Sequence, residues 1–147
     1  MKKLILLFVS SLILVSCDID DDGPTTLLTA AEVIDADLPE FFEPGETYEI
    51  DVTYLLPSAC HIAVGLDAHR GGTSGDEFRK IYITGVASYD ANVTECNEED
   101  EDLEREDSFE IKIGTNEDEP YTFFLWTGVD VDGENIYTEI VVPVGGA

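Results

Sequence analysis

The sequence predicts an all-β fold, a single immunoglobulin-like β-sandwich of about seven antiparallel strands. Three observations point to it: short runs of alternating apolar and polar residues recur at roughly ten-residue spacing, Gly, Pro, Asn and Asp separate these runs, and no segment shows helical periodicity. The cysteine and tryptophan spacing usual in immunoglobulin domains is not present, which predicts a variant of that architecture. A chain of 147 residues has material for one such domain, and we place it over residues 27–147.

The first two strands are expected on either side of a turn. We place the first near Val33–Leu38 and the second over Tyr48–Tyr54, where alternate residues are apolar. Pro44-Gly45 predicts the turn between them, and Pro57 ends the second strand.

The next three strands follow the same alternation. In residues 60–67 one face carries Cys60, Ile62, Val64 and Leu66, and we assign this face to the core. Residues 79–87 predict a fourth strand. The inner face of a fifth is marked by Phe109, Ile111 and Ile113.

The last two strands form a predicted hairpin. Tyr121–Val129 is apolar on both faces, which is typical of a central strand, and Asp132-Gly133 turns it toward Ile136–Val144. The inner face of the final strand is expected to carry Ile136, Ile140 and Val142. For Trp126, Phe124 and Tyr137, a place in the core is favoured over an exposed aromatic binding platform.

The first 16 residues have the composition of a secretion signal. Lys2 and Lys3 precede the apolar run Leu4–Val15, which is shorter than the roughly 20 residues of a membrane span. The sequence Leu14-Val15-Ser16-Cys17 resembles the bacterial lipobox. That resemblance implies removal of residues 1–16 and a Cys17 that carries several acyl chains, palmitate among them, which together anchor a protein firmly. An ordinary signal peptide with an incidental cysteine is the alternative.

An acidic segment follows the cysteine. Asp18-Ile19-Asp20-Asp21-Asp22 is similar to the export signal of Bacteroidetes surface lipoproteins, which implies display on the outer face of the outer membrane. Residues 17–26 are expected to form a flexible acidic tether.

The cysteine count agrees with a lipidated Cys17, because Cys60 and Cys96 then remain as a pair. Outside the cytoplasm such a pair is expected to form a disulfide, and its loop of about 36 residues would stabilise the fold by roughly 4 kcal/mol on the chain-entropy model. A thiol nucleophile or metal ligand, which requires a reducing compartment or further ligands, is the alternative.

The charge of the chain restricts the classes of molecule that it can bind. It has 33 acidic residues against 7 basic ones, a formal net charge of −26. Such a field repels phosphate backbones and anionic lipid, which argues against nucleic-acid binding, and it attracts cations and basic surfaces. Nine of the acidic residues lie within residues 95–107, which predicts an exposed loop. Solubility alone is the simpler explanation of the charge.

Two groups of residues are candidates for metal binding. Asp130 and Asp132, together with the acidic loop, offer the convergent oxygens that calcium prefers, although Asp132-Gly133 is also an ordinary hairpin turn. Asp67 and His69 are two residues apart on one face and could form a metal or acid–base pair, whereas His61 lies too far along an extended strand to join them. A melting curve with and without chelator would test for calcium.

Catalytic motifs are weak in this chain. There is no Gly-x-Ser-x-Gly sequence, and the sequence reveals no histidine partner for Ser58, Ser74, Ser88 or Ser108. We therefore expect a protein that is not an enzyme, with a hydrolase of surface polymers as the alternative.

A wider resemblance covers most of the chain after the signal. Its motifs are Gly45-Glu46-Thr47-Tyr48, Leu56-Pro57, Cys60-His61, Cys96, Phe124-x-Trp126-x-Gly128 and Asp132-Gly133, and they are similar to those of small surface lipoproteins of Bacteroidetes. The resemblance implies an anchored β domain and supplies no catalytic residue. The expected function is a binding or interaction module for protein or carbohydrate, with a calcium-stabilised accessory domain or a structural envelope domain as alternatives.

Overall fold

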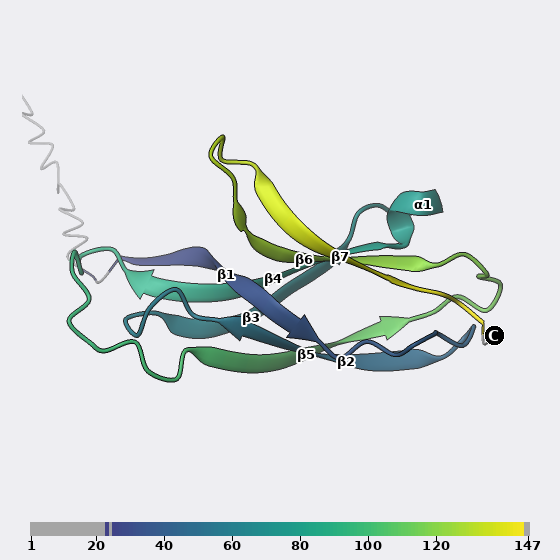
Figure 1. The fold of residues 1–147 in the computed structure, drawn as a ribbon, viewed down its shortest axis with the longest axis horizontal. Helices are drawn as coiled ribbons and strands as arrows, with labels where there is room; N and C mark the ends of the chain where they lie inside the picture. Colours follow the sequence, from purple (N-terminus) through teal and green to yellow (C-terminus); the bar gives the residue numbers. More distant parts are fainter. Residues whose placement is uncertain (1–22, 24, 146–147) are drawn as a thin grey trace, which may run out of the picture.

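Seven strands and one short helix make up residues 23 and 25–145, the part of the chain that the computed structural model describes (Figure 1). In chain order they are β1 (Thr26–Ala36), β2 (Thr47–Leu55), β3 (Ile62–Arg70), α1 (Gly75–Phe78), β4 (Lys80–Asp90), β5 (Glu104–Lys112), β6 (Tyr121–Val129) and β7 (Asn135–Val142). The predicted all-β sandwich is confirmed. The predicted signal, Cys17 and most of the tether lie outside the described residues, and no described helix has the length and apolarity to cross a membrane.

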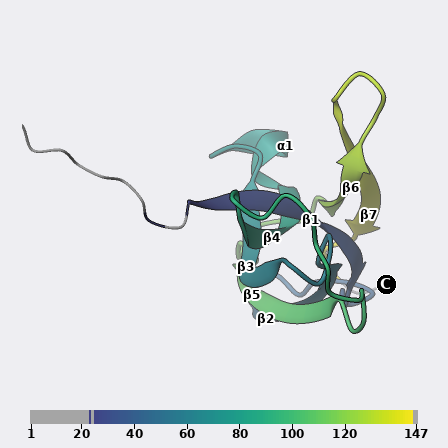
Figure 2. The same ribbon diagram turned by 90° about the vertical axis from the view of Figure 1, so that its left-hand side faces the viewer.

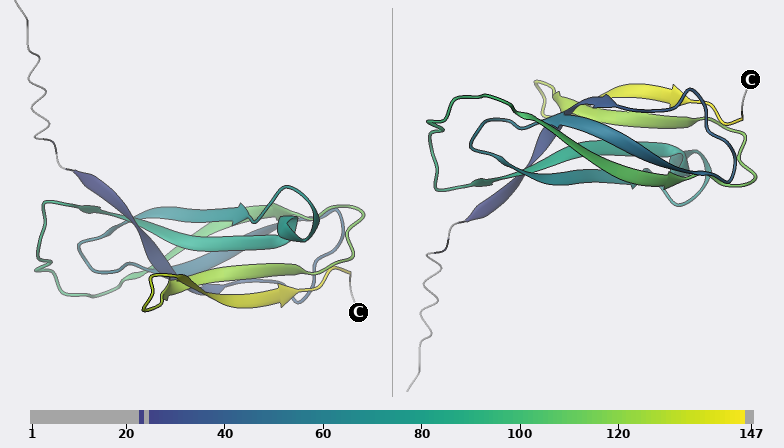
Figure 3. Two further views of the ribbon diagram at one scale, coloured as in Figure 1. Left: turned by 90° about the horizontal axis from the view of Figure 1, so that it is seen from above. Right: turned by 90° about the horizontal axis from the view of Figure 1, so that it is seen from below.

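The first strand takes part in both layers of the sandwich. Residues Thr26–Ala31 pair with β4, and residues Glu32–Ala36 pair with β2, with a register irregularity between Val33 and Asp35. β2 pairs with β5 along its whole length, and the two form the lower layer in Figure 1. Figure 3 shows the two layers from above and from below.

The second layer contains a parallel pair, which corrects the expectation that all strands are antiparallel. β3 pairs antiparallel with β4, and β7 pairs antiparallel with β6. Residues Lys80–Ile83 of β4, however, run parallel to Thr122–Leu125 of β6. One edge of β4 pairs with two strands, with β1 on its second half and β6 on its first. β6 lies between β4 and β7, as its two apolar faces predict.

The core fills the space between the two layers. The alternation in β2 places Ile50, Val52 and Tyr54 in it, as predicted. Phe42 is also fully buried although it lies in a loop, because its backbone N–H donates to the Pro143 carbonyl at 2.8 Å and fixes it at the end of the sandwich. The core residues in the other strands are Ala31, Val33, Ile81, Ile83, Ala87, Ile111, Tyr121, Phe123, Leu125 and Val142.

The predicted inner face of β3 is partly wrong. Ile62 and Val64 are exposed, whereas Leu66 packs against the core. A register shift between Ala63 and Gly65 explains the difference, because one extra residue in a strand turns the preceding side chains to the opposite face. Gly65 adopts φ +147°, which a side chain disfavours.

Three further expectations need correction. β1 begins at Thr26, well before the predicted Val33, and Glu104–Asp107 belong to β5 although they were assigned to the acidic loop. These charged residues are tolerated because β5 is an edge strand with solvent beside it. Ile136 is exposed because a register shift between Trp126 and Gly128 precedes it, and the end of the hairpin stands away from the body (Figure 2).

The two ends of the domain differ. At one end the backbone N–H of Ala91 donates to the carbonyl of Thr25, so the start of β1 lies beside the acidic loop that joins β4 to β5. Figure 1 shows α1 toward the opposite end.

Candidate functional site

Four rings form a continuous row across neighbouring strands of one layer. His69 of β3 stacks on Tyr82 of β4 with ring centres 5.7 Å apart, and Tyr82 stacks on Phe124 of β6 at 4.7 Å. Tyr137 of β7 meets Tyr82 at 5.5 Å and Phe124 at 6.1 Å, edge to face. We call these four residues the aromatic row.

Strand register places the aromatic row outside the core. His69 is the cross-strand partner of Tyr82, and Tyr82 is the partner of Phe124. Their chain neighbours Ile81, Ile83 and Phe123 point into the core, so the rings point the other way. The row lies on the face of β3, β4, β6 and β7 that is turned away from β2 and β5, and the first half of β1 extends this face beside β4. We call it the outer face.

The outer face continues beyond the rings as an aliphatic patch. Leu28 and Ile62 both pair with Ser88 from opposite sides, and Val86 is the next outward residue on β4. Leu28 is 68% exposed and Ile62 is 69% exposed. We call Leu28, Ile62 and Val64 the aliphatic patch. Thr84 and Asp67, which pair with each other, lie between this patch and the aromatic row. Large apolar side chains gathered on one exposed face are a feature of interaction surfaces.

Carboxylates accompany the aromatic row. Asp67 Oδ1 lies 3.1 Å from His69 Nδ1, which confirms that the two share a face. Glu139 is the cross-strand partner of Phe124 and is exposed. Lys80 is the basic residue nearest to Tyr82 along β4, and it forms an ion pair with Glu77 that raises the Lys80 pKa.

The three aromatic residues singled out from the sequence are not part of the core. Phe124 and Tyr137 belong to the aromatic row, and all three are partly exposed. Trp126 is the cross-strand partner of Tyr137, and its Nε1–H donates to Asn135 Oδ1 at 2.9 Å. It lines a shallow groove with Glu32 and Pro57. The assignment of these residues to the core was wrong because β6 has one of its two apolar faces on the outside.

The hairpin turn around Asp130 is held by its own hydrogen bonds. Asp130 Oδ1 accepts the backbone N–H groups of Asp132 at 2.8 Å and Glu134 at 2.9 Å. Gly133 adopts φ +81°, as an Asp-Gly turn requires. Within the described residues no group of three or more His, Cys, Asp or Glu side chains is placed to hold a metal ion. Calcium binding by Asp130 and Asp132 stays a prediction.

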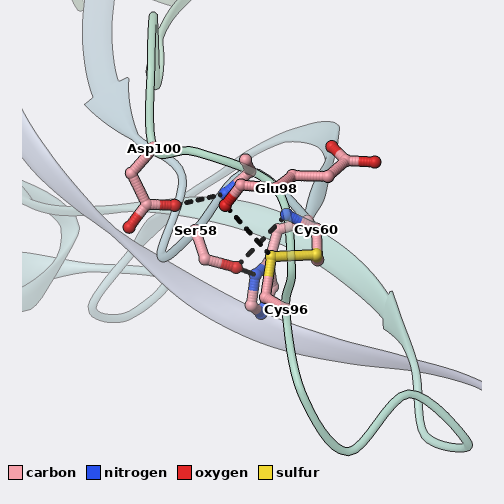
Figure 4. Close-up of a disulfide and its surroundings, with 7 residues drawn as sticks. Ser58, Cys60, Cys96, Glu98 and Asp100 are labelled. Atoms are coloured by element: carbon pink, nitrogen blue, oxygen red, sulfur yellow. Dashed lines mark hydrogen bonds between the residues drawn. A yellow bond between two sulfur atoms is a disulfide. The ribbon is translucent and has the colours of Figure 1, made fainter.

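The predicted disulfide is present, although Cys60 lies in the turn before β3 and not on a core-facing strand (Figure 4). It joins Cys60 to Cys96 across a separation of 36 residues, with Cα atoms 5.7 Å apart. The backbone N–H of Ala59 donates to Asp100 Oδ1 at 2.9 Å, which adds a second connection between the same two loops. The disulfide therefore fixes the acidic loop to the body of the domain.

A serine–histidine contact that the sequence did not reveal lies beside the disulfide. Ser58 Oγ is 2.8 Å from His61 Nδ1, and it also accepts the backbone N–H of Cys60 at 3.3 Å. The backbone N–H of His61 returns to the Ser58 carbonyl. Within the described residues no carboxylate contacts the His61 ring, which an activated serine nucleophile would need. These contacts hold the turn that carries Cys60.

A second polar cluster closes the α1 end of the domain. The guanidinium of Arg70 lies 3.8 Å from the centre of the Phe78 ring and donates to the backbone carbonyls of Phe78 and Lys112. The Tyr121 ring is buried beside it. Burial raises the pKa of Tyr121, and the neighbouring Glu117 carboxylate raises it further. This cluster joins the ends of β3, α1 and β5.

Comparisons of this chain with protein-family models, with curated proteins and with solved structures find no match. The sequence pattern identified Phe124 and Tyr137 but missed Tyr82 and the stacking role of His69. The contacts of Tyr82 with His69 and Phe124 depend on the register of β3, β4 and β6. The alternation within residues 79–87 places Tyr82 on the outward side of its strand, and this is the sequence signal that could have identified it.

Proposed function

We propose that this chain is a protein-binding module displayed on the outer membrane of a bacterium and anchored through a lipid on Cys17. The observation that carries the binding role is the aromatic row, a set of partly exposed rings on the outer face with an aliphatic patch beside it. Aromatic side chains supply large contact areas with little loss of conformational entropy, and they are enriched where proteins bind one another.

The anchor is supported by the sequence of residues 1–22, which precedes β1 by only a few residues. In cells, replacement of Cys17 by Ala should abolish incorporation of an alkyne-labelled palmitate and release the protein from the membrane fraction. Protease added to intact cells should digest the wild-type protein. Labelling that persists in Cys17→Ala, or full protection from protease, would contradict the anchor or the outward display respectively.

The binding role can be tested by cross-linking on intact cells. A photo-reactive amino acid replacing Thr84, at the centre of the outer face, should give a cross-linked species of defined mass. The matched control places the same amino acid at Glu106, an exposed position on β5 in the other layer. Equal cross-linking from both positions, or none from Thr84, would contradict a binding role for the outer face.

A further inference from the structure

We propose that the outer face binds an extended, arginine-bearing segment of its protein partner, with guanidinium groups stacked on the aromatic row and paired with Asp67 and Glu139. This inference rests on the proposed binding function and names the chemistry of the partner. Three properties of the outer face support it: the packing of its rings, the positions of its carboxylates and the charge of the whole chain.

The packing of the rings leaves one side of His69 for a planar group. Tyr82 lies between His69 and Phe124 with interplanar angles of 17° and 12°, so its two ring faces are both covered. A planar group can therefore stack only on a ring at the end of the row. The His69 side chain is 57% exposed, and a planar guanidinium can stack on its side away from Tyr82.

The carboxylates stand at both ends of the aromatic row. Asp67 contacts His69 on β3, and Glu139 lies beside Phe124 on β7. β3, β4, β6 and β7 are successive neighbours, so these carboxylates are three strand spacings apart, roughly 14 Å, and the strand registers offset them by two residues, which makes the separation about 16 Å. An extended chain covers about 3.3 Å per residue. Two arginines about four residues apart would therefore reach both carboxylates.

The charge of the chain favours a basic partner over an acidic one. The formal net charge is −26, and Lys80, beside the row, is already paired with Glu77. Electrostatic attraction raises the rate at which a basic partner meets such a surface. The chain itself uses the same contact, since Arg70 packs over the Phe78 ring at 3.8 Å.

The test uses three synthetic peptides of nine residues. One carries arginine at its third and seventh positions among threonine and valine, and the other two carry lysine or glutamate at those positions. Binding to the full chain is measured by titration calorimetry at about 150 mM salt, where long-range attraction is screened beyond roughly 8 Å. We expect the arginine peptide to bind at least fivefold more tightly than the lysine peptide and the glutamate peptide not to bind.

Two pairs of variants separate the site from general charge attraction. Asp67→Asn with Glu139→Gln should weaken binding of the arginine peptide about tenfold. The control, Asp51→Asn with Glu106→Gln on the exposed side of β2 and β5, removes the same charge and should change binding less than twofold. In His69→Ala the preference for arginine over lysine should disappear, while circular dichroism and urea midpoints verify that each variant folds.

Each other outcome would overturn the inference. Equal binding of the arginine and lysine peptides, or equal losses in the two charge variants, would reduce the effect to general attraction. Failure of all peptides to bind while cross-linking from Thr84 persists would leave the proposed function in place and exclude this partner chemistry. Binding of neutral oligosaccharides that depends on Tyr82 and Phe124 would replace the protein partner with a glycan.

Discussion

Gly85 of β4 lies directly against the Tyr54 ring of β2 in the opposite layer. A Cβ atom built there would lie 2.7 Å from Tyr54 Cδ2 and 2.9 Å from the carbonyl oxygen of Ala31. Gly85→Ala is therefore expected to destabilise the fold by roughly 1–3 kcal/mol through overpacking. Urea unfolding would measure this loss, and the neighbouring outward-facing variant Thr84→Ala should cost less. An unchanged midpoint for Gly85→Ala would show that the Tyr54 ring can move aside.

Ionisation of Tyr54 is expected to lower the free energy of unfolding at alkaline pH. Burial raises the pKa of its phenol, and the charge of Asp107 raises it further. As pH rises past about 10, the phenol therefore ionises in the unfolded chain before it does so in the folded protein. The stability that the neutral phenol contributes is complete below about pH 10 and is lost as pH rises toward the folded-state pKa. Unfolding free energies from pH 8 to 11.5 should fall less steeply in Tyr54→Phe than in the wild type, with parallel curves below pH 9. Identical slopes above pH 10 would contradict this account.

Single residues were predictable wherever an unbroken alternation set their direction. The inward positions of Ile50, Val52 and Tyr54 follow from such a run. Ile62 was not predictable, because one extra residue before Gly65 reverses the side of the strand and leaves no mark in composition. The contact between His69 and Tyr82 was also hidden, since it depends on the pairing of two strands.

At the scale of elements, the disulfide connects the acidic loop to the turn before β3. Because the Cys60–Cys96 bridge closes a loop of 36 residues, its reduction is expected to lower the unfolding free energy by roughly 4 kcal/mol on the chain-entropy model. Urea unfolding with and without reductant measures this change. Cys60→Ser with Cys96→Ser provides the control, because reductant should leave its midpoint unchanged. A wild-type midpoint that is insensitive to reductant would show that the hydrogen bonds of the two loops suffice.

The positions of the strands in the sequence were easier to predict than the way in which the strands pair. The hairpin of β6 and β7 follows from Asp132-Gly133 between two apolar runs. The parallel pairing of β4 with β6 and the division of β1 between two layers have no local signal, because both depend on which edge of β4 remains free after β3 has paired. The aromatic row results from that parallel pairing, so the candidate site could be predicted only residue by residue and not as a unit.

At the scale of the whole molecule, charge repulsion opposes folding. With 33 acidic residues against 7 basic ones, the compact state brings like charges together. Raising sodium chloride from about 10 mM to about 500 mM shortens the screening length from roughly 30 Å to below 8 Å, so the melting midpoint should rise by several degrees. Choline chloride should act equally, because screening does not depend on the cation. A larger rise with calcium at matched ionic strength would instead reveal a specific site.

The division of β1 between the two layers also has a mechanical consequence. A pulling force applied at the N-terminal end reaches the domain at Thr26, where six residues are held by β4 before the strand crosses to β2. Rupture is therefore expected in two steps, with Thr26–Ala31 peeling away first and lengthening the chain by roughly 20 Å. Optical tweezers would resolve this step as a short extension ahead of full unfolding. The first half of β1 would thus detach under tension and lengthen the tether while the rest of the sandwich stays folded.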